Sequence, residues 1–148
     1  MGKGATSVNL EKTAIIAGER NISFARALQY IDVFAEQMPS GNDKRIVVFS
    51  ENSEGWVYAF FSIWQKGAVA VPVDASSTVS DFSYILRDCT PHGIWTSQHN
   101  VPVVEQALLQ TGLSIPYYVI EERMKCEPEL TRELPERLPW AGLDVPYN

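Results

Sequence analysis

The segment from Arg45 to Ser97 reads RIVVFSENSEGWVYAFFSIWQKGAVAVPVDASSTVSDFSYILRDCTPHGIWTS, and it alternates apolar runs with helical patterns. The apolar, β-branched runs at Arg45 to Phe49, Ala68 to Val73 and Gly93 to Ser97 predict three strands. One helix-length segment separates each run from the next, and crossover connections of this kind join parallel strands. The segment therefore predicts an α/β fold, a parallel sheet with helices on both faces.

The flanking sequence extends this pattern in both directions. Thr13 to Ala17 and Asn21 to Ile22 flank turn residues, which predicts a short strand pair outside the parallel series. An amphipathic helix follows from Ser23. Beyond the central segment, Val103 to Leu109 predict a helix and Tyr117 to Ile120 a fourth parallel strand.

The two helices inside the central segment have recognisable starts. Asn52 or Ser53 is expected to cap a helix that reaches Lys66, and its many apolar residues indicate a helix enclosed by protein on most sides. Ser80 and Asp81 are expected to cap a shorter helix.

Three parts of the chain differ in character. Residues 1–12 are expected to be a mobile N-terminus, and residues 13–120 an α/β subdomain. From Glu121 onward, Glu and Pro residues accumulate and apolar periodicity is weak. Residues 121–148 are therefore predicted to be an acidic, Pro-rich tail or linker.

Composition excludes several classes of protein. The 148 residues carry a formal net charge of -6, which argues against a nucleic-acid partner because phosphate binding requires clustered Lys and Arg. No apolar run approaches the roughly 18 residues of a transmembrane helix. Cys89 and Cys126 lie far apart in a chain without a signal peptide, so we expect reduced thiols and a cytoplasmic location.

Candidate chemical groups are few, and each has a simpler structural explanation. No glycine-rich phosphate loop follows a strand, and Ser50 lacks the small neighbours of a nucleophile elbow. Zinc binding is disfavoured because the possible ligands do not form two tight pairs. Those ligands are Cys89, His92, His99 and Cys126.

Two carboxylate pairs and one aromatic run are further candidates for chemistry. Glu51 with Glu54, or Asp74 with Asp81, could in principle act as acid and base, but helix N-terminal charge and turn formation explain them better. A set of aromatic residues at helical spacing could line a hydrophobic channel, although such sets are more often core. They are Trp56, Tyr58, Phe60, Phe61 and Trp64. No catalytic, cofactor-binding or metal-binding residue is assigned.

Three stretches carry a resemblance to a known family. They are ISFARAL at Ile22 to Leu28, the strand–helix–strand run from Arg45 to Asp74, and FSYILRDCTPHGIWTS at Phe82 to Ser97. Together they resemble the N-terminal part of the AMP-binding, acyl-adenylate-forming superfamily, of the acyl-CoA synthetase type. The most specific piece is WQKGAVAVPVD, which is similar to the family's LKAGAxxVPLD segment. Arg26 and Glu51 depart from the usual Glu and Pro.

The resemblance implies an enzyme that activates a carboxylic acid, possibly a fatty acid, as acyl-AMP. ATP and magnesium serve activation in that family, and coenzyme A or a carrier thiol accepts the acyl group. The family's catalytic motifs all correspond to sequence beyond Asn148, so this chain alone is expected to be inactive and to pack against the remainder of a parent enzyme.

Two interpretations remain open. In the first, the chain is an N-terminal fragment of such a ligase, and its exposed apolar surface allows a homodimer. In the second, it is a stand-alone, non-catalytic interaction module on the same scaffold.

Overall fold

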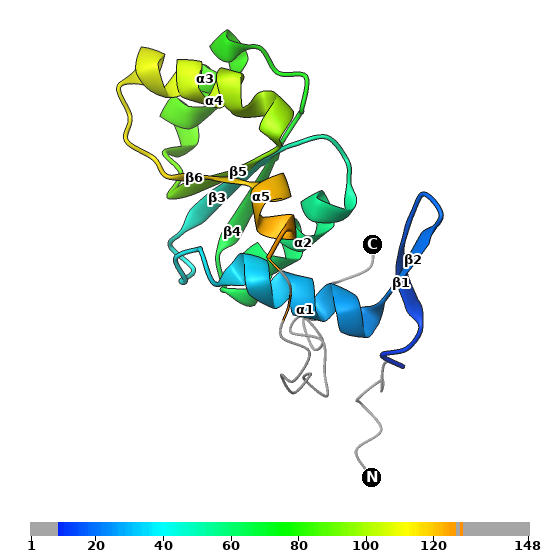
Figure 1. Cartoon of the computed structure of the whole chain (residues 1–148). Helices are drawn as coiled ribbons and strands as arrows, with labels where there is room; N and C mark the ends of the chain where they lie inside the picture. The colour runs from blue at the N-terminus through cyan, green and yellow to red at the C-terminus, as the bar shows by residue number, and fades with distance from the viewer. Residues whose placement is uncertain (1–8, 127, 129–148) are drawn as a thin grey trace, which may run out of the picture.

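The computed structural model describes residues 9–126 and residue 128, and these contain a four-stranded parallel sheet (Figure 1). In spatial order the strands are β4 (Val69–Val73), β3 (Arg45–Phe49), β5 (Gly93–Thr96) and β6 (Tyr117–Val119). Every neighbouring pair is parallel. The predicted α/β fold class is confirmed.

The strand β3 lies between β4 and β5 and is buried on both faces. Ile46, Val47, Val48 and Phe49 each have 0% relative exposure. Because successive side chains of a strand point to opposite faces, Ile46 and Val48 join one hydrophobic core and Val47 and Phe49 join another. Burial on both faces explains why this strand is continuously apolar rather than alternating.

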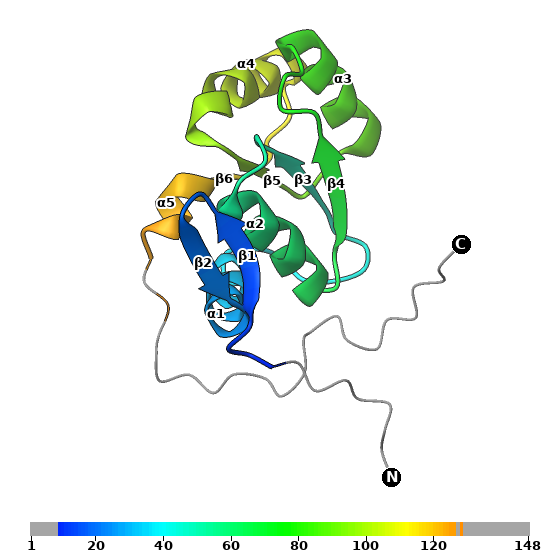
Figure 2. The ribbon, with the colours of Figure 1, turned by 90° about the vertical axis from the view of Figure 1, so that its right-hand side faces the viewer.

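Helices cover both faces of the sheet, as predicted. α1 (Phe24–Ala35), α2 (Glu54–Gln65) and α5 (Ile120–Met124) lie on one face, whereas α3 (Val79–Cys89) and α4 (Val101–Thr111) lie on the other (Figures 1 and 2). Within residues 9–126, no helix is both long enough and apolar enough to cross a membrane.

Aromatic rings occupy the centre of both cores. In the core under α1 and α2, Phe34 stacks on Trp95 with ring centroids 4.7 Å apart and meets Tyr58 edge-on at 5.8 Å. In the core under α3 and α4, Phe49 stacks on Phe82 at 4.3 Å. Such pairs contribute about 0.5–1.5 kcal/mol each beyond their buried area, so they fix how the helices sit on the sheet.

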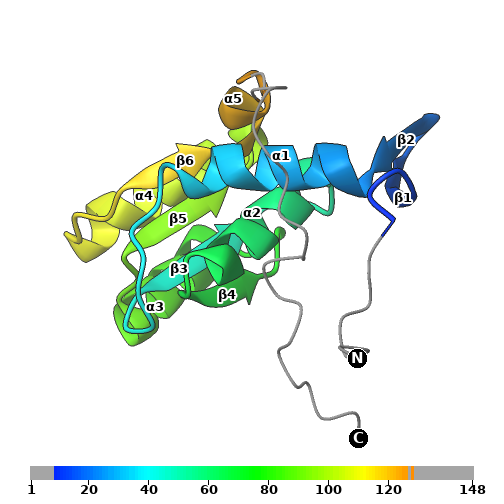
Figure 3. The same ribbon diagram turned by 90° about the horizontal axis from the view of Figure 1, so that it is seen from below.

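An antiparallel strand pair precedes α1 and lies outside the parallel sheet, as the sequence predicted (Figure 3). β1 (Thr13–Ala17) and β2 (Arg20–Ser23) are joined by a turn in which Gly18 has a φ of +63°. Glycine adopts this left-handed conformation without the steric cost that other residues incur. An ion pair of 2.9 Å between Arg20 and Glu54 connects the hairpin to α2.

The structure corrects the predicted start of α3. Sequence analysis placed the cap at Ser80 and Asp81, but the helix begins at Val79. Thr78 is the cap, because its Oγ1 accepts a hydrogen bond from the backbone N–H of Asp81 at 3.1 Å. Ser, Thr and Asp are all good capping residues, so a run containing several of them does not reveal which one is used.

The structure also corrects the start of the predicted tail. Ile120–Met124 form the helix α5, so the fourth strand ends at Val119 and the packed part of the chain continues past Glu121. Arg123 fastens α5 to α1, since its Nε donates to the carbonyl oxygen of Val33 at 2.8 Å. A five-residue helix is too short to produce a periodic signal. The remainder of the predicted tail, residues 127 and 129–148, lies outside the described residues.

The described part of the predicted mobile N-terminus is held against the start of α1. The carbonyl oxygens of Leu10 and Lys12 accept hydrogen bonds from the backbone N–H groups of Ala25 and Phe24, each at 2.9 Å. Residues 1–8 of this predicted segment lie outside the described residues.

Gly55 lies where α2 packs closely against α5. A Cβ atom at this position would overlap Cγ2 of Ile120. We predict that Gly55→Ala destabilises the chain by about 1–3 kcal/mol through overpacking, although Gly-to-Ala changes inside helices ordinarily stabilise. Urea unfolding followed by tryptophan fluorescence measures this change.

The exposed Ser80 in the first turn of α3 supplies a matched control. We expect Ser80→Ala to alter stability by less than about 0.5 kcal/mol. Adding Ile120→Ala to Gly55→Ala should cost less than the sum of the two single changes, because the two positions share one contact. A Gly55→Ala chain at least as stable as the wild type would contradict the close approach of these helices.

Candidate functional site at the carboxyl edge of the sheet

The direction in which the chain adds strands reverses between β3 and β5. From β3 the chain passes through α2 to β4 on one side, and from β5 it passes through α4 to β6 on the other. The two connecting helices therefore lie on opposite faces of the sheet (Figure 2). Ligands of open parallel sheets bind beyond the carboxyl ends of the strands at such a switch point.

A cavity of about 290 Å³ lies at this position, and we call it the switch-point cavity. Ser50 follows β3 and Ser97 follows β5, while the remaining walls come from the start of α2 and from α5. Its described lining residues are Ser50, Glu51, Ser53, Glu54, Gly55, Ser97, Ile120, Glu121 and Met124.

Ser97 is the unusual polar group of this cavity. It is 4% exposed, and its Oγ has no hydrogen-bond partner within the described residues. Leaving a buried hydroxyl unpartnered costs about 1–3 kcal/mol. By contrast, Ser50 Oγ donates to the carbonyl oxygen of Glu51 at 3.0 Å, and Ser53 Oγ accepts from the backbone N–H of Trp56 at 3.1 Å.

The charge of the switch-point cavity is negative. Glu51 and Glu121 are exposed residues on its wall, and Glu121 Oε2 accepts a hydrogen bond from the backbone N–H of Gln98 at 2.9 Å. The described lining contains no Lys or Arg. A ligand of this cavity would therefore meet carboxylates and hydroxyls rather than cations.

Glu54 is engaged in structural contacts, although the structure places it with Glu51 on the same cavity wall. It pairs with Arg20, and its Oε1 accepts a hydrogen bond from the Tyr58 hydroxyl at 2.7 Å. Burial and this hydrogen bond raise the pKa of Tyr58 far above its usual value, so the phenol remains a donor. These contacts favour the structural interpretation of Glu54 over an acid–base role.

A second cavity, of about 470 Å³, shares Ser50 and Glu51 with the first and continues along the carboxyl edge towards β4. Trp56 and Asp74 are among its lining residues. Hydrogen bonds to Asp74 from the backbone and side chain of Ser76, at 2.8 and 2.7 Å, lower the pKa of that carboxyl group. Asp81, the predicted partner of Asp74, does not line this cavity.

Neither cavity fits the phosphates of a nucleotide. Phosphate sites offer backbone N–H groups from a glycine-rich loop at a helix N-terminus, together with Lys or Arg. Here the first turn of α2 carries Glu54, and the Ser53 side chain already accepts a hydrogen bond from that turn. We derive no phosphate chemistry from these residues.

The possible zinc ligands are dispersed in the structure. Cys89 ends α3, and His92 Nδ1 accepts a hydrogen bond from the backbone N–H of Arg45 at 3.2 Å. His99 lies in the short 3-10 helix Gln98–Asn100, and Cys126 follows α5. In residues 9–126 and 128, no group of three or more His, Cys, Asp or Glu side chains could hold a metal ion. Both cysteines are unpaired.

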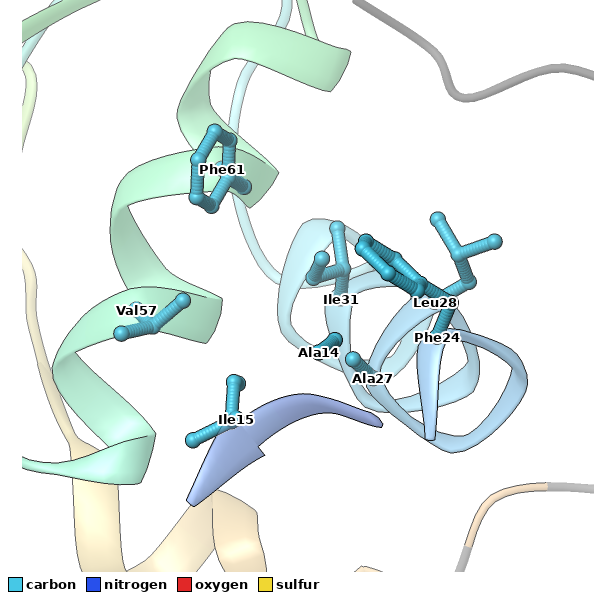
Figure 4. A pocket seen from close by; sticks show the side chains of 8 residues that line it. All are labelled: Ala14, Ile15, Phe24, Ala27, Leu28, Ile31, Val57 and Phe61. Carbon is cyan, nitrogen blue, oxygen red and sulfur yellow. The ribbon is translucent and has the colours of Figure 1, made fainter. Parts of the chain in front are cut away.

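An apolar pocket of about 230 Å³ lies between the hairpin, α1 and α2. Val57 and Phe61 on α2 face Ala27 and Ile31 on α1, and Ile15 of β1 lies below them (Figure 4). Its described lining is Ala14, Ile15, Phe24, Ala27, Leu28, Ile31, Val57 and Phe61. A cavity of about 150 Å³ with apolar walls already admits a benzene molecule, so this pocket suits an apolar group.

The prediction that α2 is enclosed on most sides is only partly right. Tyr58 is fully buried, but Trp64 is 40% exposed and Trp56 and Phe60 are partly exposed. These three residues recur every four positions and form a row, with centroid distances of 5.1 Å for Trp56–Phe60 and 5.5 Å for Phe60–Trp64. We call them the α2 aromatic row. Phe61 joins this row to the apolar pocket, because its ring contacts Phe60 and Trp64.

These observations define the chain as an open parallel α/β unit with a polar crevice at its switch point and a partly exposed row of aromatic residues on one helix. The sequence pattern of the AMP-binding enzyme family matches residues 4–140. The chain belongs to this family, and the resemblance noted from the sequence is confirmed. A search of curated proteins found no match.

Solved structures share the fold. The chain superposes on the anthranilate CoA ligase AuaEII in complex with anthranoyl-AMP with a TM-score of 0.68 and 20% identity, covering 87% of this chain and 27% of that one. The o-succinylbenzoate CoA synthetase MenE of Bacillus subtilis, bound to AMP, gives a TM-score of 0.66 at 18% identity, covering 80% of this chain and 30% of that one. A benzoate CoA ligase of Burkholderia xenovorans LB400 gives a TM-score of 0.66 at 20% identity, covering 83% of this chain and 27% of that one. The chain thus spans less than a third of each of these relatives.

Sequence reasoning missed Ser97 and Glu121 as members of a cavity. Ser97 directly follows β5, but its position beside Ser50 depends on the order of the strands in the sheet, and the apolar segments of the sequence do not specify that order. Glu121 was assigned to the tail, so its return to the edge of the sheet on α5 was not foreseen.

Proposed function

We propose that this chain is the N-terminal portion of a ligase that activates a carboxylic acid as acyl-AMP and passes the acyl group to coenzyme A or a carrier thiol. The family match over residues 4–140 supports this proposal most strongly. The fold shared with two CoA ligases and one CoA synthetase agrees with it. ATP, magnesium and coenzyme A would be bound by the parent enzyme.

In this proposal the chain serves as scaffold rather than as catalyst. Its described residues form the sheet and its two helix layers, and the polar groups at the carboxyl edge do not fit nucleotide phosphates. The acid is proposed only as a class. A fatty acid is the expectation from sequence, while the three solved relatives are named for aromatic acids. The unpaired cysteines support a cytoplasmic location.

An exchange assay tests this function. We expect no acid-dependent exchange of labelled pyrophosphate into ATP by the 148-residue chain. The natural reading frame, followed beyond Asn148 and expressed whole, should catalyse exchange with at least one member of a panel of fatty and aromatic acids.

Three results would contradict the proposal. A stop codon directly after Asn148 in the genome would favour the non-catalytic interaction module, and so would a longer product that exchanges with no acid while binding ATP normally. Acid-dependent exchange by the 148-residue chain itself would refute its role as scaffold.

We further propose that the α2 aromatic row is a contact surface. Large aromatic side chains are seldom left in water without a partner, and contiguous apolar patches mark interfaces. In a protein of the relatives' length, the remainder of the enzyme would cover the row. In the isolated chain, a second copy would do so, because the same apolar row on both copies permits a two-fold contact.

Sedimentation velocity tests the dimer. We expect the isolated chain to associate as its concentration rises to about 0.5 mM, and Trp64→Glu to weaken association at least about tenfold by placing a charge in the contact. Tyr84→Glu is the matched control, since Tyr84 is 71% exposed but lies on α3 on the opposite face. A wild-type chain that stays monomeric, or equal effects of the two variants, would contradict this surface.

A further inference from the structure

We propose that the switch-point cavity binds the ammonium group of an organic amine. This inference is independent of acid activation, because it rests on residues of the described chain and not on the family's reaction. The position agrees with the general rule for open parallel sheets, and the cavity contains a buried hydroxyl that lacks a partner.

The polar groups of the cavity determine what a ligand must offer. Glu51 and Glu121 line it as carboxylates, which only accept hydrogen bonds, and the unpartnered Ser97 Oγ can also accept one. A ligand must therefore donate. An alkylammonium group has three N–H donors and carries a positive charge at pH 7, so it matches both the hydrogen bonding and the sign of the charge.

The start of α2 does not oppose a cation here. A helix N-terminus carries a partial positive charge, but Ser53 accepts a hydrogen bond from the first turn and Glu54 adds a carboxylate to it. Glu54 is itself paired with Arg20, so the carboxylates left for a ligand are those of Glu51 and Glu121.

The cavity favours an organic cation over a metal ion. Ile120 and Met124 supply an apolar wall for methylene groups, which a metal ion would not use. No set of three or more metal-ligating side chains gathers in the described part of the chain. The adjoining cavity offers Asp74, whose carboxyl group has a lowered pKa and is ionised at neutral pH. A diamine could therefore place its second ammonium group there.

Calorimetry with 1,4-diaminobutane on the full 148-residue chain tests the proposal. At low salt and pH 7 we expect saturable binding of one diamine per chain, with a dissociation constant below about 10 mM. The uncharged 1,4-butanediol, which has the same length, should bind at least about tenfold more weakly because it lacks the charge. Backbone amide NMR shifts should locate the diamine at Ser97, Gln98 and Glu121.

Conservative variants assign the contacts. Ser97→Ala should weaken binding about tenfold, and Glu121→Gln about threefold while keeping an acceptor for the Gln98 N–H. Glu51→Gln should act like Glu121→Gln. The matched controls Ser80→Ala and Glu19→Gln change exposed residues that do not line the cavity, and they should bind as the wild type does.

Several outcomes would overturn the proposal. They are the absence of saturable binding up to about 10 mM, equal affinity for the diol, an unchanged affinity in both Ser97→Ala and Glu121→Gln, or displacement of the diamine by an equal concentration of Mg²⁺. Circular dichroism of each variant establishes that a lost affinity does not reflect a lost fold.

Discussion

The burial of β3 on both faces is the constraint on which the rest of this structure depends. Its four core residues, Ile46 to Phe49, alternate between two hydrophobic cores whose described residues do not overlap. One core joins β3 to α1, α2 and α5, and the other joins it to α3 and α4. A polar group at any of these four positions would disturb a core, since a buried polar atom without a partner costs about 1–3 kcal/mol.

The same constraint positions the polar groups of the carboxyl edge. β3 is the first strand of the parallel sheet along the sequence, and β4 and β5 pair with its two sides. The switch point therefore lies where β3 and β5 end. Ser50 and Ser97 reach this place as the residues that follow those strands. The ends of the strands thus bring together groups 47 positions apart in the sequence, while the helix α5 closes the wall with Ile120 and Glu121.

Most of the fold follows from local sequence, whereas the site does not. The apolar run of β3 could be predicted, and the cap of α2 could be narrowed to Asn52 or Ser53, because periodicity and capping chemistry are local properties of the sequence. The capping role of Thr78 and the helix α5 were missed because several side chains could cap equally well and five residues show no period. The exposed aromatic row was misjudged because a sequence reports how apolar a helix is, not how much of it the rest of the chain covers.

Native-state hydrogen exchange of the 148-residue chain tests the central role of β3 most directly. If both cores depend on this strand, the backbone amides of Val47 and Val48 should exchange only through global unfolding, with a free energy equal to that from urea denaturation. Amides of the β1–β2 hairpin should exchange through smaller openings, many times faster. Exchange of the β3 amides at the rate of the hairpin amides would contradict the account.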